Sequence, residues 1–204
     1  MRIDRTMMAL AAVALAGLPG AAVHAQSSSG SLPSNGPAVA GICYLSREAV
    51  FANAKVGQAA SARLKQLAEQ AQSQIDAERK PIEADVQAYR AKASSMSADQ
   101  RQAQEQALGQ RMQGVQTDQQ TKARQLEATR AKAMDQIASY AQPVIASAYS
   151  SKGCGVLFDR NVVLSGNMAN DLTPAVVQGL DAKVTTISFN LEPAPVANTG
   201  STTR

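Results

Sequence analysis

The stretch that decides the fold is VGQAASARLKQLAEQAQSQIDAERKPIEADVQAYRAKA, residues 56–93. Its larger apolar residues recur in steps of four, four and three, which places them on one side of an α-helix. Eleven residues in three turns is a period of about 3.67, which favours a nearly straight helix over a left-handed supercoil. We expect these positions to form the buried seam of a long helix: Val56, Ala60, Leu64, Leu67, Ala71, Ile75, Ile82, Val86, Tyr89 and Ala93.

A second stretch repeats the same spacing further along the chain. Its predicted seam is Leu108, Met112, Val115, Gln119, Ala123, Leu126, Arg130, Met134, Ile137, Ala141, Ile145 and Ala148. Between the two stretches, Ser97 and Gln100 match a capping box, the pattern of a helix N-terminus. The sequence therefore predicts an antiparallel helical hairpin over residues 53–151, with its tip near Met96.

The segments on either side of this hairpin predict a small β-rich body, residues 39–52 plus 152–191. Val39–Leu45 is expected to be a strand, followed by a helix capped by Ser46. Gly155–Phe158 and Val162–Leu164 predict a β-hairpin around the turn 159–161. A helix is expected from about Thr173 to Leu180, capped by Asp171 or Thr173 and with Pro174 at or near its first turn. Another strand is expected over residues 183–191. The fold class is α+β, mostly α, and so small a core suggests that several chains share it.

The N-terminus has the pattern of a signal peptide, residues 1–25, with Arg2 and Arg5 before an apolar run and cleavage after Ala25. The alternative is a membrane anchor that stays uncleaved. Residues 26–38 predict a flexible linker and residues 192–204 a disordered tail. His24 is the only histidine, and cleavage would remove it. We therefore expect no His-dependent catalysis and no His-ligated metal, and we predict no enzyme activity and no cofactor.

Cys43 and Cys154 are the only two cysteines. An oxidising compartment after export favours joining them as a structural disulfide. Two free, buried thiols are the alternative. A redox or metal role is not expected, because neither cysteine belongs to a Cys-x-x-Cys motif.

The predicted hairpin carries an excess of positive charge. Between Lys55 and Lys132 there are 13 basic and 9 acidic residues. Six basic residues lie toward the predicted tip: Arg79, Lys80, Arg90, Lys92, Arg101 and Arg111. They are either a solvated helix face or a means of steering anionic partners such as acidic polypeptides or lipid headgroups. We do not expect nucleic acid as a partner, because the hairpin offers almost no aromatic residue for base stacking.

Two further features of the hairpin each have two interpretations. Pro81 in the outgoing helix lies opposite Gly109 and Gly114 in the returning one, which suggests a hinge; the alternative is coincidence with a simple helix restart at Pro81. A stripe of small residues lies opposite the first seam: Ala62, Ala77, Ala84, Ala88 and Ala91. It is either a weakly apolar client surface or a consequence of the high helix propensity of alanine.

Two segments carry a resemblance to a known family. Residues 46–60, SREAVFANAKVGQAA, resemble the opening of the Skp (OmpH-like) periplasmic chaperone family. Residues 155–164, GVLFDRNVVL, and 171–177, DLTPAVV, resemble its closing hairpin and helix. The similarity covers roughly residues 39–181. The sequence departs from the family in Ser46, where an aspartate is common, in the cysteine pair, and in the extra segment after Asp181.

This resemblance implies a jellyfish-like trimer, in which three helical tentacles surround a cavity that holds unfolded outer-membrane β-barrel proteins without ATP. The family's lipopolysaccharide site is a set of basic residues, of which only a general basic tip carries over. The expected function is therefore that of a periplasmic holdase. The alternative is a structural or adaptor coiled-coil protein of the cell envelope.

Overall fold

In a computed structural model of the chain, residues 36–195 are described. The predicted signal peptide lies outside these residues, as do most of the predicted linker and tail. All described residues belong to one compact unit, Pro33–Arg204. Its helices and strands are β1 (Ile42–Leu45), α1 (Arg47–Asn53), α2 (Lys55–Lys92), α3 (Ala98–Lys152), β2 (Val156–Asp159) and α4 (Thr173–Lys183), with short 3₁₀ turns at Ala93–Ser95, Arg160–Val162 and Met168–Asn170.

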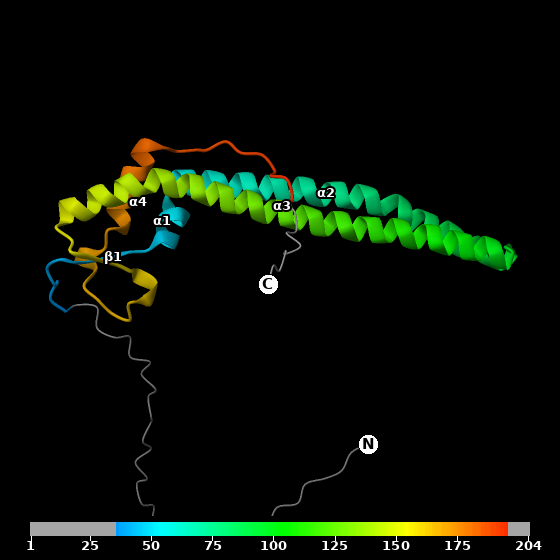
Figure 1. Ribbon diagram of the computed structural model, residues 1–204, viewed down its shortest axis with the longest axis horizontal. Helices are drawn as coiled ribbons and strands as arrows, with labels where there is room; N and C mark the ends of the chain where they lie inside the picture. Colours follow the sequence, from blue (N-terminus) through cyan, green and yellow to red (C-terminus); the bar gives the residue numbers. More distant parts are fainter. Residues whose placement is uncertain (1–35, 196–204) are drawn as a thin grey trace, which may run out of the picture. The chain divides into compact units, whose positions relative to one another are not determined.

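Helices α2 and α3 form the predicted antiparallel hairpin, here called the arm, and they lie side by side along its length (Figure 1). At 1.5 Å per residue, the 55 residues of α3 reach about 80 Å. The tip is the 3₁₀ turn Ala93–Ser95 followed by Met96. The Ser97 hydroxyl accepts from Gln100 N, and the Gln100 side chain accepts from Ser97 N. The predicted hairpin and its capping box are confirmed.

The seam predicted for the outgoing helix is also confirmed. Its buried members in α2 are Val56, Ala60, Leu67, Ala71, Ile75 and Ile82, and its other four members are half-buried. Toward the tip, Ile75 and Ile82 pack with Leu108 and Val115 of α3 in a small separate cluster. Since apolar burial contributes about 25 cal/mol per Å², this thin seam provides the main favourable contact between the two helices of the outer arm.

The seam predicted for the returning helix is wrong in its middle. Arg130 and Met134 are exposed, whereas Thr129 and Ala133 are buried. The small side chains of Thr129 and Ala133 leave room for close contact, and Thr129 is further covered by Glu192, whose N–H donates to the threonine hydroxyl. The exact spacing therefore holds only near the two ends of α3, where Leu108, Val115, Ile137 and Ala141 are buried as predicted.

The start of the arm is set by a sharp bend between α1 and α2. Ser46 caps α1 as predicted, accepting from Ala49 N. Ala54 then leaves the helical conformation, with ψ at 142°. A Cβ on Gly57 would lie 1.8 Å from the Phe51 carbonyl oxygen. Only glycine fits at this position, because the first turn of α2 approaches the backbone of α1 so closely.

The sheet of the body differs from the predicted one. Its two strands are parallel: Ile42 is paired with Val156 and Leu45 with Asp159. The predicted β-hairpin is wrong, because after β2 the Asp159 carboxylate accepts from Asn161 N and caps the turn Arg160–Val162. Residues 162–164 therefore pair with no strand among the described residues. Within residues 36–195 these two short strands are the only ones, and the first begins at Ile42 rather than Val39, after Gly41 with φ at 78°.

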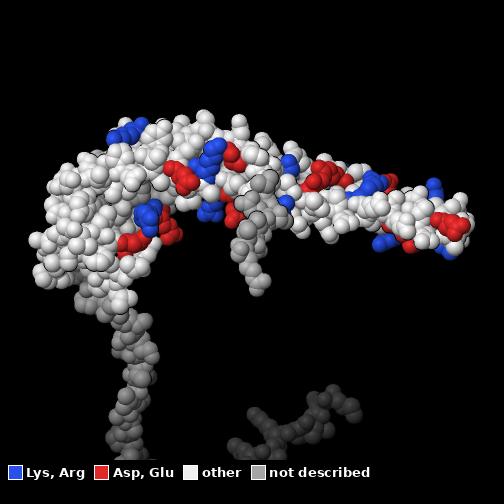
Figure 2. Space-filling view, viewed as in Figure 1, with Lys and Arg blue, Asp and Glu red and all other residues white. Residues whose placement is uncertain are grey.

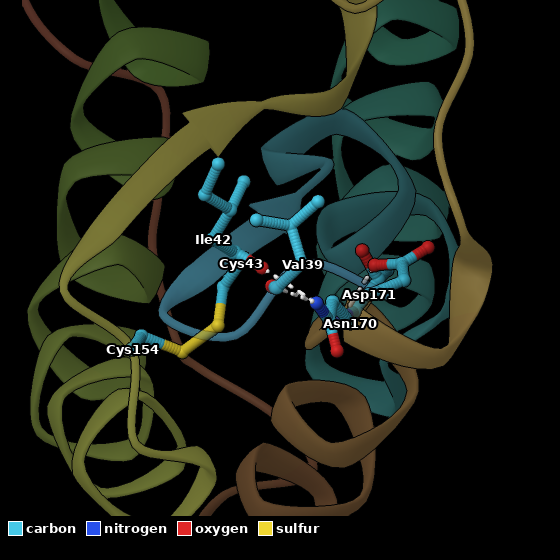
Figure 3. The surroundings of a disulfide bond; sticks show 7 residues. Val39, Ile42, Cys43, Cys154, Asn170 and Asp171 are labelled. Carbon is cyan, nitrogen blue, oxygen red and sulfur yellow. Dashed lines mark hydrogen bonds between the residues drawn. A yellow bond between two sulfur atoms is a disulfide. The ribbon is translucent and has the colours of Figure 1, made fainter. Parts of the chain in front are cut away.

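The other edge of β1 is closed by the segment before α4. Tyr44 bridges Asp171, and Leu172 N donates to Tyr44 O at 2.9 Å. The Asn170 side-chain amide donates to the carbonyls of Val39 and Ile42 (Figure 3). The predicted helix begins at Thr173, with Pro174 in its first turn, but its N-cap position is Leu172 rather than Asp171 or Thr173. The Asp171 carboxylate, one residue earlier, accepts from Thr173 N. It runs to Lys183, slightly beyond its predicted end.

A disulfide joins Cys43 in β1 to Cys154, just before β2 (Figure 3). The two Cα atoms lie 5.8 Å apart, although the cysteines are separated by 111 positions. Cys43 is buried in the core that contains residues from α1, the bases of α2 and α3, and α4. The bond therefore closes the chain at the place where the arm leaves the body and returns to it.

The strand predicted over Lys183–Leu191 is wrong. Residues 184–195 form no ladder with any described strand. They continue from α4 as an extended segment that lies along the arm (Figure 1). Arg63 donates to Phe189 O, and Lys132 forms an ion pair with Glu192. Side chains of the arm hold this segment in place of a neighbouring strand.

Removing the disulfide should lower the stability of the body strongly. Cross-linking a loop of this length lowers the entropy of the unfolded chain and contributes about 5 kcal/mol in the chain-entropy treatment. Cys43→Ala with Cys154→Ala should therefore shift the guanidinium unfolding midpoint far down. A reductant should lower the unfolding midpoint of the wild type by a similar amount and should leave the midpoint of the double variant unchanged. If the wild type has the same unfolding midpoint with and without reductant, the disulfide does not have this role.

Candidate binding surfaces of the arm and body

Polar contacts hold the arm tip in one conformation. Arg101 donates to Met96 O at 2.7 Å and more weakly to Ala93 O. Tyr89 of α2 donates to the Glu105 carboxylate of α3, so the two helices are linked one or two turns from the tip. This hydrogen bond raises the pKa of the Tyr89 hydroxyl above its usual value of 10.0, because ionising the phenol would place a second negative charge beside Glu105. The Tyr89 hydroxyl therefore keeps the proton that it donates to Glu105 at physiological pH.

The six predicted tip cations fall into two groups. Three have partners: Arg79 pairs with Asp76 and Glu83, Arg111 pairs with Asp85 across the hairpin at 2.6 Å, and Arg101 binds the tip carbonyls. For Lys80, Arg90 and Lys92, no ion pair is formed within residues 36–195. These three exposed cations are the part of the predicted set that is free to meet an anionic partner.

The tip is not a uniformly basic surface. Figure 2 shows acidic and basic side chains next to one another along this face of the arm, including its far end. Between Arg79 and Arg111 the sequence has six basic and four acidic residues, a net charge of +2. Any electrostatic attraction of a client is therefore modest and depends on the few unpaired cations.

The predicted small-residue stripe is exposed throughout. Ala84, Ala88 and Ala91 face solvent on the outer half of α2, and Ala62 and Ala77 face solvent nearer its base. None of them contributes to the buried seam. The stripe offers a shallow surface that another chain can reach, but nothing in its geometry selects a ligand.

Pro81 and the two glycines occupy the predicted places on the arm. Pro81 lies inside α2, which continues through it from Lys55 to Lys92. Gly109 and Gly114 lie inside α3, and a Cβ at either would have no neighbouring atom within 4 Å. The helix is therefore not restarted at Pro81. Glycine is also not required for packing at 109 or 114, so the hinge stays a prediction.

An apolar groove on the lower arm was missed by the sequence reasoning. A cavity of about 520 Å³ lies between α1 and α3 and is lined by Phe51, Met134 and Ile145, among others. A second cavity of about 560 Å³ lies between α2 and α3 and is lined by Phe51, Leu64 and Leu126. Phe51 borders both. Met134, which was predicted for the helix seam, lines the cavity beside α1 instead. Leu126, also predicted for the seam, does face α2, but across the second cavity.

A second missed surface lies on the body. Apolar side chains are exposed on β2 and on the loop after it: Val156, Phe158, Val162, Leu164 and Met168. Leu164 is 91% exposed and Val162 is 74% exposed. We call these five residues the body patch. A group of exposed apolar side chains is typical of a protein interface. The apolar residues of 156–158 and 162–164, which the sequence analysis interpreted as a β-hairpin, were the signal that could have found it.

The described residues show no feature of a metal centre or a membrane span. No group of His, Cys, Asp and Glu within residues 36–195 could hold a metal ion. In the same range, no helix has the length and apolar character needed to cross a bilayer.

Comparisons with known proteins show that this chain belongs to a known family. The sequence profile of a family described as outer membrane protein (OmpH-like) matches residues 41–180. A solved structure from Caulobacter crescentus CB15, assigned as an OmpH-like outer membrane chaperone, is 31% identical, with a TM-score of 0.71. The similarity covers 79% of this chain and 95% of that one. No curated protein matches the chain.

The hinge prediction can be tested by stiffening the arm. Replacing Pro81, Gly109 and Gly114 with Ala should favour continuous helix by about 3 kcal/mol for Pro and about 1 kcal/mol for each Gly. Spin labels at the exposed residues Ser94 and Gln70 are about 36 Å apart along the helix axis. Their distance distribution should narrow in the triple variant.

Gln110→Ala, between the two glycines on the exposed face of α3, is the control and should leave the distribution unchanged. An equally broad distribution in the triple variant would show that these residues are not a hinge.

Proposed function

Because the chain belongs to the OmpH-like family of outer membrane proteins, we propose that it is an ATP-independent periplasmic holdase for unfolded outer-membrane β-barrel proteins. The observation that carries the proposal is the arm itself. Its helices reach about 57 Å (α2) and 80 Å (α3), far beyond the small body, and the arm exposes shallow apolar surfaces along its length. Such a surface fits an extended chain better than a small substrate. An adaptor role would use the arm as a spacer and would leave its groove unexplained.

The proposed location is the periplasm, after cleavage behind Ala25. The family is periplasmic, and the cysteine pair fits an oxidising compartment. Outside the cytoplasm the protein has no ATP supply, so client binding and release must follow from binding equilibria alone. Many weak contacts allow release without ATP, because each contact with the client can break independently of the others.

The proposed assembly is a homotrimer built through the body. The body patch offers exposed apolar side chains, and β2 has one strand neighbour and one open edge. An open edge with apolar side chains is a template for pairing with another strand. Val163, which follows the 3₁₀ turn in an extended conformation, and the exposed Leu164 form no strand ladder within the described chain and could extend such pairing. Three arms that leave one body would enclose a client between them.

The proposed client contacts lie on the arm. The Ala84, Ala88 and Ala91 stripe and the lower groove would contribute weak apolar contacts, and Lys80, Arg90 and Lys92 would attract acidic segments. Binding of lipopolysaccharide or another anionic lipid at the same cations remains a prediction. Many weak contacts within one enclosed space raise the effective concentration of each and so retain the client.

The holdase function is tested by light scattering. The protein should suppress the aggregation of an unfolded outer-membrane β-barrel protein diluted from urea, without ATP. An adaptor coiled coil would leave the scattering unchanged, and this result would refute the proposed function.

Charge reversal at the tip should slow client capture. Arg90→Glu with Lys92→Glu removes two of the three unpaired cations, and steering by charge acts mainly on the association rate. We expect association with an acidic unfolded client to slow by about tenfold at low salt, and much less at 1 M salt, where the Debye length is about 3 Å. Stopped-flow fluorescence of a labelled client measures both rates.

Lys152→Glu with Lys183→Glu is the matched control. It changes the net charge equally, and its residues also lie in the last turns of their helices, so the helix-dipole cost is comparable. Equal slowing by both pairs would mean that only total charge matters, and no slowing by the tip pair would make the tip a solvated face.

Disrupting the body patch should dissociate the trimer. Burying a side chain such as Leu164 contributes about 1.5–3 kcal/mol, and Leu164→Lys would bury a charge instead. Sedimentation at micromolar concentration should show a trimer for the wild type and smaller species for the variant. Met112→Lys, which alters an exposed apolar residue of the arm, should remain trimeric. A wild-type monomer would contradict the proposed assembly.

A further inference from the structure

Residues 184–195 extend beyond the part of the chain that matches the family profile, which ends at residue 180. They follow α4 and lie along the arm (Figure 1). Their exposure alternates: Ile187, Phe189 and Leu191 are half-buried, whereas Thr186, Ser188 and Asn190 are exposed. Ile187 and Phe189 pack against the core at the base of the arm. This segment is thus a single β-like strand with its apolar face on the protein and no neighbouring strand.

The arm holds the backbone of this segment through side chains of both helices. Arg63 of α2 donates from Nε to Phe189 O at 3.4 Å, and Thr129 of α3 accepts from Glu192 N at 2.9 Å. Arg63 and Thr129 are equally far from Met96 in sequence, so they face one another at one level of the hairpin. A donor for a carbonyl and an acceptor for an N–H recognise an extended main chain irrespective of its side chains.

One acceptor at this place has no donor. Thr129 is 1% exposed, and its hydroxyl donates to Gln125 O and accepts from Glu192 N. Gln125, one helical turn nearer the tip, has a buried side-chain oxygen without a hydrogen-bond partner among the described residues. The chain continues after Glu192 with Pro193, Ala194 and Pro195. The two prolines have no N–H to donate, and the Ala194 N–H does not bond to this oxygen. The chain's own segment is therefore an imperfect ligand for the surface it covers.

We propose that the surface formed by Arg63, Gln125, Thr129 and Lys132, here called the strand site, binds an extended polypeptide with apolar residues at every second position. Residues 184–192 occupy it as an internal competitor. Strands of outer-membrane β-barrels have this same alternation, so the inference that such strands are the external ligand rests on the proposed function. The Lys132–Glu192 ion pair, at 2.8 Å, adds a preference for an acidic residue at the end of the bound stretch.

The probe is a labelled peptide with the chain's own residues 184–192, VTTISFNLE. In the full chain, Phe189→Ser with Leu191→Ser should release the internal segment, because both side chains are half-buried. The peptide should then bind at least tenfold more tightly than to the wild type, where a tethered competitor has an effective concentration in the millimolar range. Fluorescence anisotropy measures both affinities, and circular dichroism shows that the released variant keeps its helices.

Three controls test whether binding depends on release of the segment, on the alternating pattern of the peptide and on the strand site. Thr186→Ala with Ser188→Ala alters exposed positions of the same segment and should bind the peptide as weakly as the wild type. The peptide VIFLTTSNE has the same composition without the alternation and should not bind. Adding Thr129→Val to the released variant removes an acceptor at constant size and should weaken peptide binding by about tenfold.

The proposal is overturned if the released variant binds the peptide no better than the wild type, or binds both peptides equally. Should release unfold the protein, amide exchange of the wild type decides the matter. Excess VTTISFNLE should speed exchange in residues 187–192, and unchanged exchange overturns the proposal.

A last measurement separates this site from the holdase function. An unfolded β-barrel protein should displace the labelled peptide from the released variant. If it does not, the strand site is not a client site, while suppression of aggregation by the wild type would leave the proposed function intact.

Discussion

The whole structure depends on the parallel pairing of two strands that are separated by the length of the arm. Parallel strands cannot be joined by a tight turn and always need a crossover connection; here the crossover is α1, α2 and α3. Gly41 O accepts from both Gly155 N and Val156 N, at 2.7 and 2.9 Å, and the Cys43–Cys154 disulfide lies beside this contact. Closing so long a loop costs entropy before any strand contact forms. The disulfide lowers that cost, because the unfolded chain is already closed at the same two positions.

Once the base is closed, the arm needs few strong contacts of its own. The outer seam has one small apolar cluster around Ile75, Ile82, Leu108 and Val115. Much of the remaining surface is alanine, glutamine and charge, which favours helix without calling for further packing. Cross-helix links such as Arg111–Asp85 are exposed and contribute little. The arm can therefore leave shallow surfaces open, because its helices do not depend on burying them.

The sequence predicts the structure correctly where one local pattern determines one contact. Apolar spacing predicted the seam of α2, and Ser97 with Gln100 predicted where α3 begins. The prediction fails where a pattern shows that side chains are buried but not which element they pack against. Met134 follows the helix period but lines a cavity beside α1. Residues 183–191 alternate like a strand, yet the burial comes from packing on helices and no ladder forms. A period of two or 3.6 shows which side chains face a surface; which surface it is depends on contacts between distant parts of the chain.

The extended segment and the strands of the proposed client both have apolar residues at every second position. This shared pattern explains how one surface could bind either chain. A helical arm has no free backbone groups to pair with a strand, so it can hold an extended chain only through side chains, as Arg63 and Thr129 do here. Such contacts are few, and an unpaired buried acceptor such as Gln125 costs about 1–3 kcal/mol. An internal segment that leaves this acceptor unpaired protects the apolar surface but remains weaker than a chain that can donate to it. The two prolines after Glu192 thus favour exchange, because neither has an N–H that could pair with the Gln125 oxygen.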